Sequence, residues 1–364
     1  MHELECLLEA MSRAGLKAEL RKANPDGWNK VWLELSYQPV PYAKSTLDYY
    51  HAYFRGIGWD IEDVSLVLLN DNSPCGIWPL SLGINSSGKT ELINMGAGLA
   101  SPLFIAGLSP KTVKKICSNA LKFLNELGRI IGLPKIDVEQ WVEPSRSGMG
   151  VPEWHQLLMS AGAVPAVRHD LFVDLARTMG EIRSNFRKSY KSLINAGLRN
   201  WDVFTVDESN VSKAQWDEFK SLHSTVAGRS TRSDRTWGIH LAMIKDGEAF
   251  LTCLRDPADG NLVGGGFFQH TRDEGVYAVA VYDRRLFEKP LGHVVQQIAI
   301  ERMKERGLKW YRIGERFYAQ NNPCPSDKEV SISSFKQGFA SHMFCRYVFQ
   351  LPVANDQAVR NKCC

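Results

Sequence analysis

One α/β pattern occurs twice in this chain, and that repeat constrains the fold more than any other feature. From Ser45 to Glu143, and again from Ser212 to Gly314, the hydrophobic pattern predicts a helix, three strands joined by tight turns, a loop, a long amphipathic helix and a strand. The copies share this order but few identical residues. A tandem of one unit in 364 residues predicts two domains of the same kind, and ligands tend to bind where two domains meet.

The second copy shows the pattern more clearly. Its strand-like runs are rich in aromatic and β-branched residues, and Gly and Asp in the intervening turns favour an antiparallel meander. Apolar residues at helical spacing from Leu291 to Met303, followed by Gly307, predict a helix and its end. The expected strands lie at 249–256, 262–271, 276–283 and 308–313 in the second copy, and at 64–71, 75–84, 89–95 and 136–142 in the first, where the long helix begins after Ser109.

Composition agrees with a globular protein that has two ordinary cores, since 44% of the residues are hydrophobic and 23% are charged. No run approaches the roughly 20 apolar residues that cross a bilayer, and no signal-peptide pattern opens the sequence, so we expect a cytoplasmic protein without a transmembrane segment. A net charge of +4 permits an anionic partner. The eight cysteines include no C-x-x-C pair, which predicts reduced, packed thiols and no metal site.

Positive charge is concentrated between Arg168 and Arg199, where seven Lys or Arg accompany three acidic residues. After a predicted capping box, we expect one helix on which Arg183, Arg187 and Lys191 stand above one another at intervals of four residues. Like charges so placed cost roughly 0.2–0.5 kcal/mol per pair. The segment is therefore either a helix that contacts phosphate or a solvated face that carboxylates from elsewhere neutralise.

Residues 83–90 (GINSSGKT) match the phosphate-binding pattern G-x-x-x-x-G-K-[ST] at every fixed position. Such a loop holds phosphate only where a helix begins at the Lys. The residues after Thr90 are strand-like and soon interrupted by Gly96 and Gly98. We therefore predict a hairpin turn here, and an ATP-using enzyme built on this loop is the alternative.

Three consecutive glycines, Gly264 to Gly266, lie in the middle of a predicted strand. Glycine weakens a strand and offers no side chain for packing. They predict either a bulge or a ligand held against bare backbone.

The order of elements resembles the Gcn5-related N-acetyltransferase (GNAT) fold, with a late helix at 331–339 and a last strand at 343–351. Residues 183–197 and 328–340 resemble more narrowly the second domain of the Fem family (FemA/FemB/FemX-like peptidoglycan-bridge aminoacyl transferases). The most specific piece is Phe335-Lys336 with Gly338-Phe339. The resemblance covers roughly 165–350 at the level of motifs and the first half only in architecture.

The resemblance implies an α/β (α+β) fold of two tandem acyl-CoA N-acyltransferase-like (GNAT) domains, whose mixed, mostly antiparallel sheets are flanked by helices. We expect the first domain at 1–165, as a candidate acceptor-binding domain. The second, with the Fem-like motifs, is expected at 166–350, and a C-terminal tail at 351–364. The long charged helical pair that some Fem proteins insert is missing, which leaves the acceptor and the donor class open.

The implied chemistry is transfer of an acyl or aminoacyl group to a primary amine, for which positioned hydrogen-bond donors matter more than a covalent nucleophile. From the Phe-Lys pair, Lys336 is the expected catalytic donor. The resemblance implies roles for nine further residues: Tyr282 (catalytic); Arg183, Arg187, Lys188 and Arg316 (substrate binding); Arg284, Arg285, Lys289 and Gly292 (donor binding).

Fem-like enzymes take the amino acid from aminoacyl-tRNA, whereas the wider fold takes acyl groups from coenzyme A, and the sequence does not choose between them. We expect no tightly bound cofactor. The expected acceptor is a small-molecule or lipid-linked amine of a cell-envelope or polysaccharide precursor, with an amino sugar or other small amine as the acyl-CoA alternative. A non-catalytic binding module is a further alternative. The sequence leaves the oligomeric state open.

Overall fold

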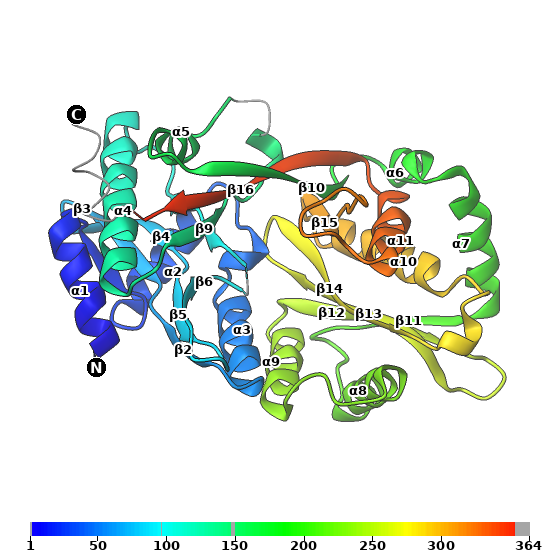
Figure 1. Cartoon of the computed structure of the whole chain (residues 1–364). Coiled ribbons are helices and arrows are strands. Elements are labelled where there is room, and N and C mark those ends of the chain that lie inside the picture. Colours follow the sequence, from blue (N-terminus) through cyan, green and yellow to red (C-terminus); the bar gives the residue numbers. More distant parts are fainter. Residues whose placement is uncertain (1, 96, 147–149, 354–364) are drawn as a thin grey trace. The chain divides into compact units, whose positions relative to one another are not determined.

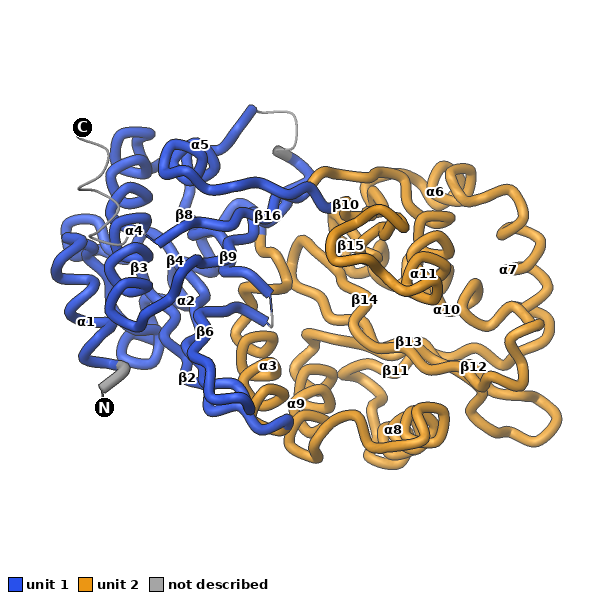
Figure 2. Tube along the Cα trace, in the orientation of Figure 1, with its two compact units in different colours: residues 1–37, 57–168, 346–364 blue, residues 38–56, 169–345 orange. Residues whose placement is uncertain are grey.

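The computed structural model describes residues 2–95, 97–146 and 150–353 (Figure 1). The chain divides into two compact units, which Figure 2 colours separately. Unit 1 comprises residues 1–37, 57–168 and 346–364, and unit 2 comprises residues 38–56 and 169–345. Residues 38–56 therefore belong to a unit that is otherwise formed far along the chain.

Unit 1 has two small antiparallel sheets with strand orders β1-β3-β4-β8 and β2-β5-β6, and a third group in which β9 pairs with β7 and with the end of β16. The long helix α4 begins at the predicted place, because the Ser109 side chain caps it by accepting from the Thr112 N–H. The elements of unit 1 are α1 (His2–Ala14), β1 (Ala18–Leu20), α2 (Pro25–Glu34), β2 (Asp60–Asp63), β3 (Leu66–Asn70), β4 (Ser73–Trp78), β5 (Ser81–Ile84), β6 (Thr90–Ile93), β7 (Leu99–Ala100), β8 (Leu103–Phe104), α4 (Pro110–Ile130), β9 (Lys135–Glu139) and α5 (Glu153–Ser160).

The first meander differs from its prediction. The expected strand 75–84 is two strands, β4 and β5, which belong to different sheets. Pro79 and Leu80 separate them. Because proline has no backbone N–H, it cannot donate a hydrogen bond to a neighbouring strand, and the strand ends there. This split explains why the first copy reads less clearly in the sequence.

Unit 2 is built on the strand order β11-β12-β13-β14-β15-β10, with β10 followed by the start of β16. The predicted meander is confirmed, since β12, β13 and β14 pair antiparallel, whereas β15 runs parallel to β14. The elements of unit 2 are α3 (Lys44–Gly56), α6 (Met179–Asn185), α7 (Lys188–Asn200), β11 (Asp202–Val206), α8 (Lys213–Ala227), α9 (Asp234–Lys245), β12 (Ala249–Arg255), β13 (Leu262–His270), β14 (Glu274–Tyr282), α10 (Leu291–Glu305), β15 (Trp310–Glu315) and α11 (Asp327–Gln337). β10 (Val164–Asp174) belongs to it from residue 169 on, and β16 (His342–Pro352) up to residue 345.

Close packing explains the glycines in β13. A Cβ on Gly264 would lie 2.7 Å from the Tyr282 ring, and one on Gly266 would lie 2.8 Å from the Phe268 ring and 3.0 Å from Val295 of α10. The predicted bulge is present beside them, where the pairing with β12 shifts register. The alternative of a ligand on bare backbone is wrong, because side chains of this unit fill that space.

A buried carboxylate ties residues 38–56 to the rest of unit 2. Asp273, in the turn between β13 and β14, is fully buried and accepts from the Gln38 N–H at 3.0 Å. Its oxygens lie 2.6 Å from Lys309 Nζ and 2.9 Å from Arg272 Nη2. Burial raises the pKa of Asp273, but the hydrogen bonds from Lys309 and Arg272 outweigh it and hold that pKa below the usual value.

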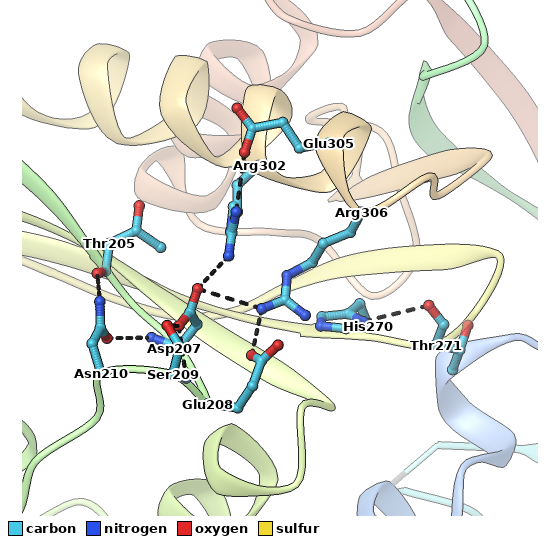
Figure 3. Close-up of polar contacts among 10 residues, drawn as sticks. All are labelled: Thr205, Asp207, Glu208, Ser209, Asn210, His270, Thr271, Arg302, Glu305 and Arg306. Carbon is cyan, nitrogen blue, oxygen red and sulfur yellow. Dashed lines mark hydrogen bonds and ion pairs between the residues drawn. The ribbon is translucent and has the colours of Figure 1, made fainter.

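A second carboxylate joins α10 to the end of β11 (Figure 3). Asp207 accepts from the Ser209 hydroxyl at 2.6 Å and pairs with Arg302 and, at 3.6 Å, with Arg306. Arg306 also pairs with Glu208 at 2.5 Å. These contacts fix the C-terminal end of α10 to the residues that follow β11.

Four cysteines are buried as predicted, and burial raises the pKa of Cys75 to about 11 and that of Cys117 and Cys253 to about 12. Cys324 and Cys345 are exposed, so the expectation of packed thiols is wrong for these two. Residues 354–364, most of the expected C-terminal tail, lie outside the described residues, as do Cys363 and Cys364. In the described part of the chain, no helix is long and apolar enough to cross a membrane.

Candidate active site

Lys336 lies in the last turn of α11 and rests on the end of β15. Its Nζ is 2.8 Å from the point where a Cβ of Gly314 would stand, and Gly314 has a φ of 141° that favours glycine. The same Nζ lies 5.4 Å from the centre of the Tyr277 ring. The ammonium is thus partly buried against the backbone of Gly314 and the face of the Tyr277 ring. None of the described carboxylates pairs with it.

That position changes how readily Lys336 holds its proton. Burial, with a smaller contribution from the charge of Arg312, lowers the pKa of Lys336 from 10.5 to about 8. The side chain is therefore mostly charged at neutral pH yet poorly solvated. A poorly solvated cation is a strong hydrogen-bond donor to an anionic oxygen.

The Tyr277 ring beneath the Lys336 ammonium carries a hydroxyl that is hydrogen-bonded to the hydroxyl of Tyr282. The Tyr277 and Tyr282 oxygens are 2.9 Å apart, and burial raises the pKa of Tyr277 to about 12 and that of Tyr282 well above its usual value. Both phenols therefore stay neutral and can donate hydrogen bonds. Since Tyr277 contacts both Lys336 and Tyr282, the structure brings the two predicted catalytic residues to one place.

The expected donor-binding residues lie before and within the first turn of α10. Gly292 packs against the Phe335 and Tyr282 rings, 3.1 and 3.6 Å from its would-be Cβ, so this turn adjoins the Lys336 site. Lys289 lies over the Trp201 ring at 5.0 Å, and Arg285 pairs with Asp283 at 2.6 Å. Arg284 is exposed in the same loop.

The predicted column of cations on one helix is wrong. The helix is interrupted at Phe186 and Arg187, so Arg183 belongs to α6 and Lys191 to α7. The break has a tertiary cause, because the Arg187 N–H donates to the Gly338 carbonyl at 2.7 Å instead of to a helix carbonyl.

The three predicted substrate-binding cations of this segment are thereby separated. Arg183 donates to the Asn195 side chain at 3.0 Å. Arg187 donates to the Ser334 carbonyl at 2.9 Å and lies over the Tyr190 ring. Lys188 is exposed at the start of α7. Only Arg187 adjoins the turn of α11 that carries Lys336.

Arg316 lies directly after β15 and turns toward α11. Its Nη1 donates to the Ser333 hydroxyl at 2.9 Å and its Nε to the Gln337 side chain at 2.8 Å. It also lies over the Tyr318 ring, 4.5 Å from the centre. The structure therefore places this predicted substrate-binding residue beside the Lys336 turn, with its donors directed at protein atoms.

Sequence reasoning missed Tyr277, Ser333 and Tyr190. Tyr190 explains the Gly338 of the Fem-like motif, because a Cβ there would lie 2.3 Å from its ring, and its hydroxyl donates to the Phe335 carbonyl at 3.1 Å. Tyr277 and Ser333 carried no local signal, since a tyrosine in a strand and a serine in a helix are ordinary. Within the described ranges, no group of three or more His, Cys, Asp or Glu is placed to hold a metal ion.

The predicted hairpin at residues 83–90 is confirmed. β5 and β6 pair antiparallel, and between them the Asn85 N–H donates to the Lys89 carbonyl at 3.0 Å, with Gly88 at a φ of 77°. No helix begins at Lys89, so the loop lacks the amide cradle that binds phosphate. This removes the structural basis of the ATP-using alternative.

We expect Lys89→Ala to leave the free energy of unfolding within about 0.5 kcal/mol of the wild type, because Lys89 is exposed and its contact with Glu91 is a surface ion pair. Denaturant titration and nucleotide binding measure this. Magnesium-dependent ATP binding that the substitution abolishes would contradict the hairpin interpretation.

The solved structures that share this fold include FemX and L-PGS. The match to FemX covers 96% of this chain and all of FemX, with 11% sequence identity and a TM-score of 0.65. The match to L-PGS from Bacillus licheniformis covers 92% of this chain and 94% of that one, with 12% identity and a TM-score of 0.56. Comparisons with protein families and with curated protein sequences find no match. The chain thus shares its fold with FemX and L-PGS, as the Fem-like resemblance of the sequence implied.

Proposed function

We propose that the protein transfers an acyl or aminoacyl group from an activated donor to a primary amine. The observation that carries this proposal is Lys336, a partly buried ammonium without a carboxylate partner among the described residues, held over the ring of Tyr277, whose hydroxyl is hydrogen-bonded to that of Tyr282. The fold shared with FemX supports the same class of reaction.

The reaction needs little covalent help from the protein. The lone pair of a neutral amine attacks the carbonyl carbon of an ester or thioester, and the carbonyl π electrons move onto oxygen. Collapse of this tetrahedral intermediate forms the amide and expels the alcohol or thiol, while the amine loses a proton. Lys336 would donate a hydrogen bond to the oxyanion, and one tyrosine hydroxyl could donate a second or orient a substrate.

The donor and the acceptor are the finer part of the proposal. The Fem-like motifs at 183–197 and 328–340 favour aminoacyl-tRNA as donor and an amine of a cell-envelope precursor as acceptor. Acyl-CoA with an amino sugar is the second candidate. The observation that favours it is the basic loop that leads into the N-terminus of α10, in which Arg284 and Lys289 are exposed.

A transfer assay tests both candidates. Purified protein is incubated with acetyl-CoA or with charged tRNA, each combined with a panel of amines that includes nucleotide-linked and lipid-linked amino compounds, and amide products are identified by mass spectrometry. We expect one donor class to give product. If neither donor binds or reacts, the protein is a binding module that kept only the fold.

The pH dependence of turnover provides a further prediction. Because the pKa of Lys336 is about 8, a reaction that needs its ammonium should slow as the pH rises through about 8. Lys336→Arg should move this decline to higher pH, because a guanidinium keeps its proton. Initial rates at saturating substrate measure both profiles. A wild-type rate that keeps rising above pH 9 would show that the charged lysine is not the donor.

A further inference from the structure

A single buried serine connects α11 to the end of β15. Ser333 is 1% exposed, and its hydroxyl oxygen accepts from Arg316 Nη1 at 2.9 Å and from the Phe317 N–H at 3.1 Å. The same hydroxyl donates to the Val330 carbonyl, one turn back in its own helix, at 2.8 Å. The hydrogen-bonding capacity of this side chain is fully used.

Arg316 spans the helical turn that contains Lys336. It contacts Ser333 and, four residues later on the same face, Gln337. The backbone N–H of Arg316 donates to the His169 carbonyl of β10 at 2.7 Å, so the residue that contacts Ser333 and Gln337 is itself fixed to the sheet. Gly314, on which the Lys336 ammonium rests, lies two residues before Arg316 in the same strand end.

The C-terminal end of α11 is held independently on another side. The Arg187 and Tyr190 side chains donate to the Ser334 and Phe335 carbonyls, and the Arg187 N–H donates to the Gly338 carbonyl. These contacts satisfy carbonyls that a helix end leaves free. They fix the position of the end of α11 along the helix axis. The Ser333 contacts set the distance and rotation of α11 relative to β15.

We infer that Ser333 and Arg316 are positioning residues, which hold the Lys336 ammonium against Gly314 where it meets the reacting carbonyl; the inference rests on the proposed function. Arg316 on this view acts through α11, although sequence analysis assigned it to substrate. A long, flexible lysine needs such support, because a displacement of about 1 Å at a reacting group can cost on the order of 100-fold in rate.

The test compares Ser333→Ala with Ser331→Ala, an exposed serine on the same helix. Ser333→Ala leaves the Phe317 N–H and Arg316 Nη1 without their shared acceptor, and we expect kcat to fall about tenfold with KM for both substrates unchanged. Ser331→Ala should behave as wild type. Arg316→Lys, which cannot contact Ser333 and Gln337 together, should lose a similar factor even if Ser333→Ala folds poorly.

Two measurements separate positioning from general damage. In a Lys336→Met background, Ser333→Ala should lower kcat no further, because residues that act as a unit are not additive. The pH dependence of Lys336 labelling by an amine-reactive reagent, read by mass spectrometry, should shift upward in Ser333→Ala as the ammonium becomes better solvated.

The labelling result does not depend on any transfer activity, so it tests the positioning even if the proposed function fails. The inference is overturned if labelling of Lys336 is unchanged in both Ser333→Ala and Arg316→Lys. It is also overturned if Ser333→Ala lowers kcat as much in the Lys336→Met background as in wild type. Absence of transfer in wild type, with the labelling shift present, rejects the proposed function alone.

Discussion

Lys336→Met should lower the turnover of acyl transfer by about 100- to 1000-fold, the effect of removing one oxyanion donor worth about 3–4 kcal/mol. The methionine keeps most of the apolar stem against Gly314 and the Tyr277 ring. The loss should fall on kcat, because the interaction forms with charge that develops only in the transition state. Steady-state kinetics with the donor identified by the transfer assay measure it.

Stability should not fall with activity in this variant. Lys336 has no ion-pair partner among the described residues, and burial penalises its charge, so removal of the charge relieves that penalty and loses only the contact with the Tyr277 ring. Lys328→Met, at an exposed position near the start of α11, is the matched control and should keep full turnover. A Lys336→Met protein that keeps more than about a third of wild-type turnover would reject Lys336 as the donor.

Asp273→Ala should lower the free energy of unfolding by about 3 kcal/mol, at the lower end of the range for breaking a buried ion pair. The lower end applies because Arg272 and Lys309 are about half exposed and can be solvated once the carboxylate is lost. The Gln38 N–H loses its acceptor as well, so residues 38–56 should loosen first. Urea unfolding gives the total, and hydrogen exchange of the amides in α3 reports the local part.

The contribution of Asp273 should also depend on pH. Its pKa is lowered in the folded protein, so its stabilisation is present above the pKa of an unfolded aspartate and is lost as the pH falls through the folded value. Asp273→Asn should therefore flatten the acid side of the stability profile. Asp259→Ala, at an exposed position in the other turn of the meander, is the control and should lower the free energy of unfolding far less than Asp273→Ala. Equal losses in the two variants would mean that burial of Asp273 is irrelevant.

Local chemistry determined the elements that the sequence predicted correctly. Strand-like runs and turn residues predicted the β12–β14 meander. Capping residues predicted where α4 and α6 begin. The strand-like run after Thr90 predicted the hairpin at residues 83–90. Each of these signals acts over about a turn or a strand pair, so it can be read along the chain. The Phe335-Lys336 pair likewise indicated the residue around which the candidate site is built.

Contacts between distant residues decided the rest. The break before α7 exists because the Arg187 N–H donates to the Gly338 carbonyl. Residues 38–56 join unit 2 because Asp273 accepts from the Gln38 N–H and Tyr49 packs in the core of that unit. The lowered pKa of Lys336 arises from burial against β15, which no neighbour in sequence provides. Sequence alone thus determined the second meander, the two helix starts, the hairpin at residues 83–90 and which lysine to examine. Tertiary structure decided what surrounds that lysine, because desolvation and hydrogen-bond partners depend on groups far away in the chain.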